Sequence, residues 1–116
     1  MDDRRSNPRL SVSLDAHWSG EDGETPAKIT DLSQGGCYLD TVGEVRRGEI
    51  VAFRVLLPDG DFLYLEGEVR HYTAGTGFGV QFVDLNEEQT ASLKRLIQIA
   101  TESGSSEPIP ASLVED

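Results

Sequence analysis

The chain has 116 residues, of which 37% are hydrophobic and 27% are charged, and its formal net charge is -11. This length suits one domain with a single hydrophobic core. The charge argues against bulk nucleic-acid binding, because an acidic body repels a phosphate backbone at long range. An anionic ligand would therefore have to be met by a local cluster of arginines.

Cysteine and histidine are scarce, and no long apolar run is present. Cys37 stands alone, which excludes an internal disulfide, and with His17 and His71 it provides too few soft ligands for a structural zinc. No apolar run approaches the roughly 18 residues that span a bilayer, and no apolar signal-peptide region follows residues 1–5. We therefore expect a cytoplasmic protein that does not insert into a membrane and needs no metal or other cofactor.

The N-terminal residues predict an arm followed by a strand. Residues 1–9 form the arm; residues 4–9 are polar throughout and include Arg4, Arg5 and Arg9, and Pro8 removes a backbone donor. We expect this arm to be flexible. Apolar and polar residues then alternate as far as Trp18, the period-two pattern of a half-buried strand over residues 9–18.

Five further strands are expected, separated by turns rich in glycine, proline and acidic residues. A hairpin loop over residues 19–24 leads to a second strand that ends at Thr30, and a polar loop follows at residues 31–36. The remaining strands are expected at residues 37–39, 50–57, 62–72 and 78–82, with turns at residues 43–48, 58–61 and 75–79.

The last expected element is a helix. Asn86 is a good N-cap, Gln89 stands three residues later as in a capping box, and Leu85 occupies the preceding staple position. The narrow apolar stripe favours packing against the chain's own barrel over binding a partner, and it consists of Leu93, Leu96, Ile97 and Ala100. Residues 101–116 are predicted to form a disordered acidic tail.

Six short strands followed by one helix predict a mainly all-β domain over residues 10–100. The expected architecture is a six-stranded antiparallel β-barrel with one C-terminal α-helix. No internal repeat is evident.

The loop at residues 31–36 is the main candidate binding site. Asp31 offers acceptors, Ser33 offers a donor, and Gly35 and Gly36 leave the backbone open to close approach, which suits a polar small molecule. The same residue types also form ordinary turns, because Asp and Ser side chains hydrogen-bond to their own backbone.

The arm and the loop together resemble the PilZ domain family. The arm reads Arg5-x-x-x-Arg9, and the loop reads Asp31-x-Ser33-x-x-Gly36, in the order and in the elements where that family carries them. The resemblance covers residues 4–100. It implies a barrel with a C-terminal helix that binds the bacterial second messenger cyclic di-GMP.

The resemblance also implies which residues contact this ligand. Arg5 and Arg9 would donate to guanine edges or phosphates, and Arg4 adds a third guanidinium. Asp31 would accept from guanine N–H groups, Ser33 would bond a base edge or a phosphate, and Gly35 and Gly36 complete the loop. Gly36 would let the backbone turn where a side chain would obstruct the ligand.

The implied function is that of a receptor or adaptor and not of an enzyme. The arm would become ordered over the barrel when the ligand binds, and the chain would signal to an unidentified partner protein in motility, biofilm or surface-polysaccharide control. The doubled Arg4-Arg5 leaves open whether one or two stacked ligand molecules bind. A monomer or weak dimer is expected.

Three alternatives remain to be weighed. A PilZ-fold protein-interaction module that does not bind the nucleotide would commonly have an eroded motif, whereas this motif is intact. An enzyme would need a nucleophile, base and metal set, and Ser33 near Asp31 has no histidine partner in the sequence pattern. A single-strand nucleic-acid barrel would need basic grooves with exposed aromatic residues, which the acid excess argues against.

Overall fold

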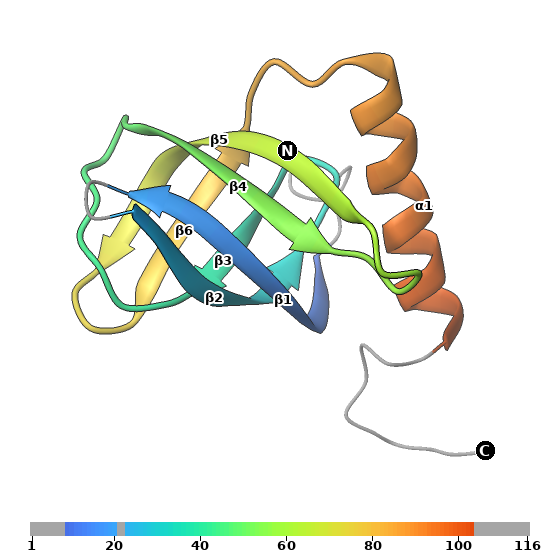
Figure 1. Ribbon diagram of the computed structural model, residues 1–116, viewed down its shortest axis with the longest axis horizontal. Helices are drawn as coiled ribbons and strands as arrows, with labels where there is room; N and C mark the ends of the chain where they lie inside the picture. Colours follow the sequence, from blue (N-terminus) through green and yellow to red (C-terminus); the bar gives the residue numbers. More distant parts are fainter. Residues whose placement is uncertain (1–8, 21–22, 104–116) are drawn as a thin grey trace, which may run out of the picture.

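The computed structural model describes residues 9–20 and 23–103, which form a closed barrel and one helix (Figure 1). The barrel order is β1-β2-β3-β6-β5-β4, and all neighbouring strands are antiparallel. This confirms the predicted architecture. In this ring β2 and β3 lie opposite β5 and β4. The strands are β1 (Leu10–Gly20), β2 (Gly23–Leu32), β3 (Gly36–Asp40), β4 (Ile50–Leu56), β5 (Phe62–Thr73) and β6 (Gly77–Phe82).

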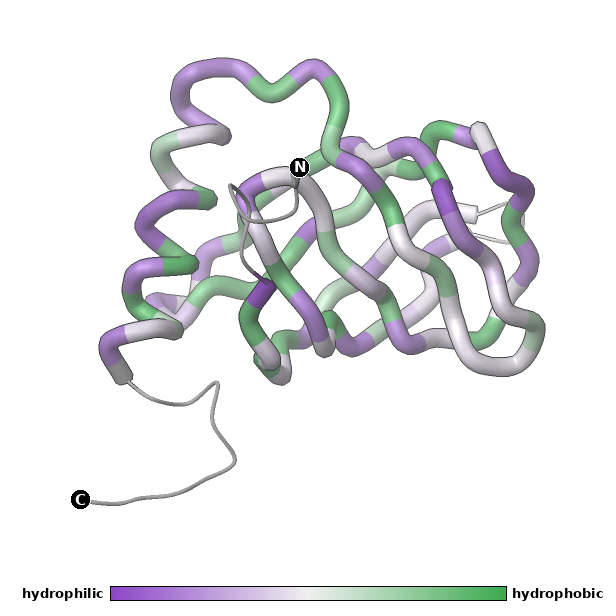
Figure 2. The backbone as a smooth tube through the Cα atoms, turned by 180° about the vertical axis from the view of Figure 1, so that it is seen from behind, coloured by the Kyte–Doolittle hydropathy of each residue, from purple (hydrophilic) through white to green (hydrophobic). Residues whose placement is uncertain are grey.

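The barrel interior is filled by alternate residues of the strands, and Figure 2 shows hydrophobic and hydrophilic residues following one another along them. Trp18 and Phe78 pack edge to face with ring centroids 5.1 Å apart. The Trp18 Nε1–H donates to the buried Thr41 Oγ1 at 3.0 Å, so the one polar atom of the indole is satisfied. Each large apolar side chain buried in this way contributes about 1.5 to 3 kcal/mol to stability.

Several strand boundaries differ from the sequence prediction, mostly because the hydrogen-bonded ladders continue further than expected; β4 instead ends one residue early, at Leu56. The loop predicted over residues 19–24 is wrong in length, since β1 continues to Gly20 and β2 starts at Gly23, and these two residues pair with each other. β2 continues past Thr30 to Leu32. β6 begins at Gly77, inside the turn expected at residues 75–79.

The helix α1 (Glu87–Ser103) begins as the sequence predicts. The Gln89 backbone N–H donates to Asn86 Oδ1 at 2.7 Å, and the Asn86 backbone N–H donates to Gln89 Oε1 at 2.9 Å, which is a complete capping box. Leu93 and Leu96 are buried in the same core as the barrel interior. The helix therefore covers its own barrel, as expected.

The helix ends later than predicted. It includes residues 101–103, which the sequence analysis assigned to the tail. Side-chain contacts support this last turn, because Thr101 Oγ1 donates to the Ile97 carbonyl at 2.8 Å and Gln98 Nε2 donates to Glu102 Oε2 at 3.1 Å. The rest of the predicted tail lies outside the described residues. Within the described part of the chain, no helix is long and apolar enough to cross a membrane.

Candidate ligand-binding site

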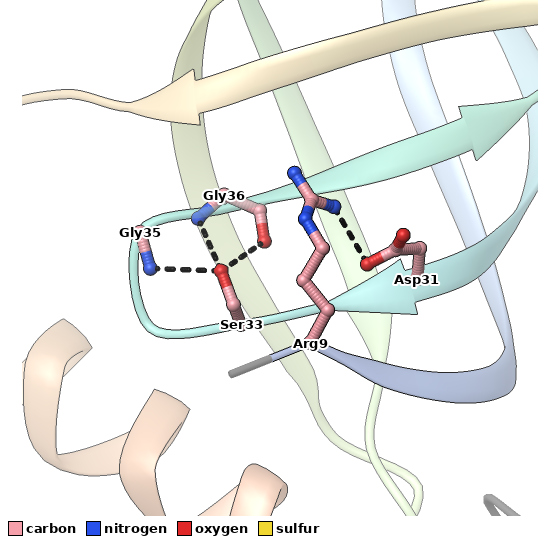
Figure 3. A network of polar contacts seen from close by, with 5 residues as sticks. All are labelled: Arg9, Asp31, Ser33, Gly35 and Gly36. Atoms are coloured by element: carbon pink, nitrogen blue, oxygen red, sulfur yellow. Dashed lines mark hydrogen bonds and ion pairs between the residues drawn. The ribbon is translucent and has the colours of Figure 1, made fainter. Parts of the chain in front are cut away.

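Arg9, the last residue of the arm motif, lies beside the loop motif on the barrel surface (Figure 3). Arg9 directly precedes β1, and Asp31 is the last residue but one of β2, where it pairs with Ser11 of β1. The Arg9 guanidinium donates to Asp31 Oδ1 at 2.7 Å across 22 residues of sequence. Both side chains are accessible, with exposed fractions of 57% and 35%. The Arg9–Asp31 ion pair is thus accessible to solvent and is not a buried structural salt bridge.

An irregularity in β2 directs Asp31 outward. Ile29 pairs with Leu39 of β3 while Asp31 pairs with Tyr38, so Thr30 is an extra residue in β2. Strict alternation from the buried Ile29 would place Asp31 in the core. The bulge shifts the alternation by one residue, which leaves Asp31 on the outer face and buries Leu32 instead.

The Ser33 hydroxyl holds the loop that follows (Figure 3). Its Oγ accepts from the backbone N–H groups of Gly35 and Gly36, each at 3.2 Å, and donates to the Gly36 carbonyl at 3.3 Å. The Ser33 backbone N–H donates to the same carbonyl at 2.9 Å. The side chain is buried, and one donated and two accepted bonds use the full capacity of a hydroxyl. Ser33 therefore fixes the loop that begins two residues after Asp31.

Strand β6 supports the loop from the other side. The Phe82 N–H donates to the Gly35 carbonyl at 2.9 Å, and Gly36 pairs with Gln81. A Cβ at Gly36 would lie 2.1 Å from the backbone oxygen of Val80, a distance that no real side chain reaches. Glycine is thus required here by the close approach of β6, which is a different reason from the ligand space that the sequence suggested.

Cys37 is buried next to the site, and its thiol is unreactive. The side chain is buried, and burial raises the pKa of the Cys37 thiol far above its usual range, with the nearby Asp31 carboxylate raising it further. A protonated buried thiol is a poor nucleophile and a poor metal ligand. Among the described residues no group of three or more His, Cys, Asp or Glu side chains could hold a metal ion.

Comparison with protein families identifies the family of the chain. The family model described as the PilZ domain matches residues 3–98 of the 116-residue chain. The chain belongs to the PilZ domain family. A search of the curated proteins found no match.

Solved structures share the PilZ fold at low sequence identity. YcgR from Escherichia coli in complex with c-di-GMP is 16% identical with a TM-score of 0.74, covering 87% of this chain and 47% of that one. The Bacillus subtilis inhibitor of motility, MotI/DgrA, is 17% identical with a TM-score of 0.70, covering 87% and 53%. This chain thus spans about half the length of those two. The PilZ domain of E. coli YcgR with c-di-GMP is 17% identical with a TM-score of 0.69, covering 87% and 95%.

The structure brings five of the seven predicted site residues of this PilZ domain together: Arg9, Asp31, Ser33, Gly35 and Gly36 (Figure 3). Arg4 and Arg5 lie outside the described residues. Sequence reasoning missed the support from β6, because only the register of β3 and β6 brings Gln81 and Phe82 to the loop. It also missed the bulge at Thr30, for which a single sequence has no clear signal.

Proposed function

We propose that this PilZ domain is a receptor for cyclic di-GMP, with Arg9 and Asp31 as its central contacts. The observation that carries the proposal is the 2.7 Å contact between these two side chains beside the loop that Ser33 holds. The Arg9 guanidinium, a hydrogen-bond donor, and the Asp31 carboxylate, an acceptor, lie in direct contact on the outer face of the barrel. The complex of YcgR with c-di-GMP, on the same fold, supports the ligand class.

The chemistry of the pair matches the ligand. Guanine offers acceptors at O6 and N7 and donors at N1 and N2, and each phosphodiester carries one negative charge. Arg9 can donate in bidentate fashion to O6 and N7 or to a phosphate, and its planar guanidinium can stack on a purine. Asp31 can accept from N1–H and N2–H, since only its Oδ1 receives a protein hydrogen bond within the described residues.

Ligand binding requires little rearrangement of this pair. An exposed ion pair contributes only about 0 to 1 kcal/mol, because both groups remain largely hydrated. The Arg9 side chain is 57% exposed, so its guanidinium can turn from Asp31 to the ligand at small cost. The contact keeps both groups near the productive geometry and still leaves them available.

In this proposal Arg4 and Arg5 donate to the same ligand as the chain ahead of Arg9 folds over it. Ordering five residues costs several kcal/mol at about 1 to 2 kcal/mol per residue. Each charge-assisted hydrogen bond contributes about 1.5 to 3 kcal/mol, so several arginine contacts are needed to offset that cost. The folded arm then changes the surface that the barrel presents.

Ser33, Gly35 and Gly36 serve the proposal mainly as a rigid support. The Ser33 hydroxyl is fully engaged inside the loop, and Gly35 and Gly36 are tied to β6. Their effect on the ligand is therefore to hold Asp31 and the loop backbone in place. Direct contact of these residues with the ligand stays a prediction.

The proposed output is a protein partner in the cytoplasm. We assign the chain to bacterial motility, biofilm or surface-polysaccharide control as an adaptor without catalytic activity. The B. subtilis inhibitor of motility, on the same fold, supports this class of output. A monomer or weak dimer that takes one or two stacked ligand molecules fits the proposal.

Isothermal titration calorimetry tests it. Cyclic di-GMP is titrated into the full chain and into an Arg5→Ala, Arg9→Ala double variant, with GTP and cyclic di-AMP as controls. Saturable binding of cyclic di-GMP to the wild type alone is expected, with a shallow salt dependence because only two phosphates are neutralised. Absence of heat from folded wild-type protein at high ligand concentration would exclude the receptor function.

A further inference from the structure

The outer face of β4 and β5 carries large apolar side chains where a barrel surface is usually polar. Leu56 pairs with Phe62 across the two strands, and Arg54 pairs with Tyr64. Leu56, Phe62 and Tyr64 are 36%, 40% and 63% exposed. The outward residues of β1, in contrast, include serine and aspartate. We call the surface formed by Leu56, Phe62 and Tyr64 the β4–β5 face.

The β4–β5 face is pre-arranged by contacts among its own side chains. The Phe62 and Tyr64 rings have centroids 6.4 Å apart, and the guanidinium carbon of Arg54 lies 4.9 Å from the Phe62 ring centroid. Arg54 is also ion-paired with Glu24 of β2. Exposed aromatic rings that already contact their neighbours lose little conformational entropy when a partner covers them. Tyrosine and arginine are both enriched at protein interfaces.

A groove of about 250 Å³ adjoins this face. It extends across β1, β4 and β5 to the start of α1, and Ala52, Tyr64 and Gln89 contribute to its lining. Gln89 is itself fixed, because its Nε2 donates to the Tyr64 carbonyl at 2.7 Å. The Gln89 side chain is therefore held against β5 at the edge of the groove, beside the exposed Tyr64 ring.

The net negative charge of the groove favours a cationic group of a partner. Three carboxylates line it, from Glu24, Glu66 and Asp84, against one guanidinium, from Arg54. Glu24 is paired with Arg54, and within the described residues Glu66 and Asp84 have no ion-pair partner. Nδ1 of His17, a further lining residue, is buried and has no hydrogen-bond partner there. This nitrogen can accept a hydrogen bond when the ring proton is on Nε2.

We propose that the β4–β5 face and its groove bind a segment of a partner protein in which a lysine or arginine is flanked by apolar side chains. The apolar residues would cover Phe62 and Tyr64, and the cation would enter the groove toward Glu66 and Asp84. In the barrel ring β4 and β5 lie opposite β3 and β2, which carry the Asp31 loop. A partner here and a ligand at Arg9 and Asp31 can therefore be bound at the same time.

A random peptide library displayed on phage, selected on the immobilised full chain without nucleotide, tests the proposal. Its result is independent of the cyclic di-GMP proposal because no nucleotide is present. Tyr64→Ser removes the exposed ring and Glu66→Lys reverses the charge, and both positions are exposed, so the barrel core is untouched. Val42→Ser is the matched control, since Val42 is 69% exposed in the loop between β3 and β4.

Retained peptides should be rich in lysine or arginine next to apolar residues. One such peptide, synthesised and titrated, should bind at least about tenfold more weakly to each of the two variants and equally to the control, as expected for a contact residue at an interface centre. Failure to retain any peptide, retention of acidic peptides, or equal binding to the Tyr64→Ser and Glu66→Lys variants would overturn the proposal.

Discussion

The guanidinium of Arg9 donates to Asp31 Oδ1 at 2.7 Å and so joins the start of the first barrel strand to the end of the second. The contact places the Arg9 guanidinium beside the Asp31 carboxylate, just ahead of the loop (Figure 3). A ligand that binds Asp31 therefore meets Arg9 at the same time. Both side chains are accessible, which makes the contact suited to exchange with a ligand.

A double-mutant cycle of Arg9→Ala and Asp31→Ala should give a coupling energy below about 1 kcal/mol in the free energy of unfolding, because the pair is exposed. In contrast, the affinity for cyclic di-GMP should fall by roughly ten- to hundred-fold or more in either single variant. Chemical denaturation and calorimetry measure the two effects. A coupling of several kcal/mol in stability would mean that the pair is structural instead.

Gly36→Ala should destabilise the barrel by about 1 to 3 kcal/mol, because the new Cβ would be forced against the Val80 carbonyl and the strands would have to separate. Gly79→Ala is the matched control on β6. Its Cβ would meet Tyr38 at 3.5 Å, His71 at 3.6 Å and the Cys37 carbonyl oxygen at 3.9 Å, which are ordinary contacts. Urea denaturation compares the two variants. Equal stability of both would contradict the close approach of β3 and β6.

Ser33→Ala should lower the free energy of unfolding by about 1 to 3 kcal/mol, since the N–H groups of Gly35 and Gly36 lose their acceptor. Hydrogen exchange of the Gly36 amide should accelerate. Ser13→Ala on the exposed face of β1 should change neither quantity. If Ser33→Ala leaves the Gly36 amide as protected as before, the hydroxyl does not hold the loop.

The Cys37 thiol should resist alkylation in the folded protein and react once the protein is unfolded, because burial raises its pKa. The raised pKa also makes the stability of the fold depend on pH. The unfolded thiol ionises near its usual pKa of 9.0 while the folded thiol stays protonated, so this contribution lowers stability as the pH rises above 9.0. Iodoacetamide labelling and denaturation at several pH values check both points. The Cys37→Ala variant should not show the loss of stability that thiol ionisation causes at high pH. Rapid labelling under native conditions would contradict the buried position.

The sequence predicted the barrel because its strands keep a clear two-residue period and its helix carries a complete capping signal. Asn86 and Gln89 form the expected reciprocal bonds, and Leu93 and Leu96 are buried as expected. Boundaries were less accurate, as at Gly20 and Gly23, because the length of a ladder depends on pairing with a distant strand and not on local composition.

The sequence nominated residues for the site, and the way the structure builds it depends on features that the sequence does not show. Arg9 and Asp31 were predicted as contacts of one ligand, which stays a prediction, and the structure places their side chains in contact. The outward direction of Asp31 depends on the extra residue Thr30, and the need for glycine at position 36 depends on Val80. Both features arise from the register between strands, which no local pattern encodes.

The proposed function depends on cyclic di-GMP binding at Arg9 and Asp31. Titration of the ¹⁵N-labelled full chain with cyclic di-GMP, followed by nuclear magnetic resonance of the backbone amides, tests it most directly. We expect saturable shifts at Arg9, at Asp31 and in the loop that ends at Gly36, and none at Phe62 and Tyr64 on β5 across the barrel. No shifts at saturating nucleotide, or shifts confined to the β4–β5 face, would contradict it.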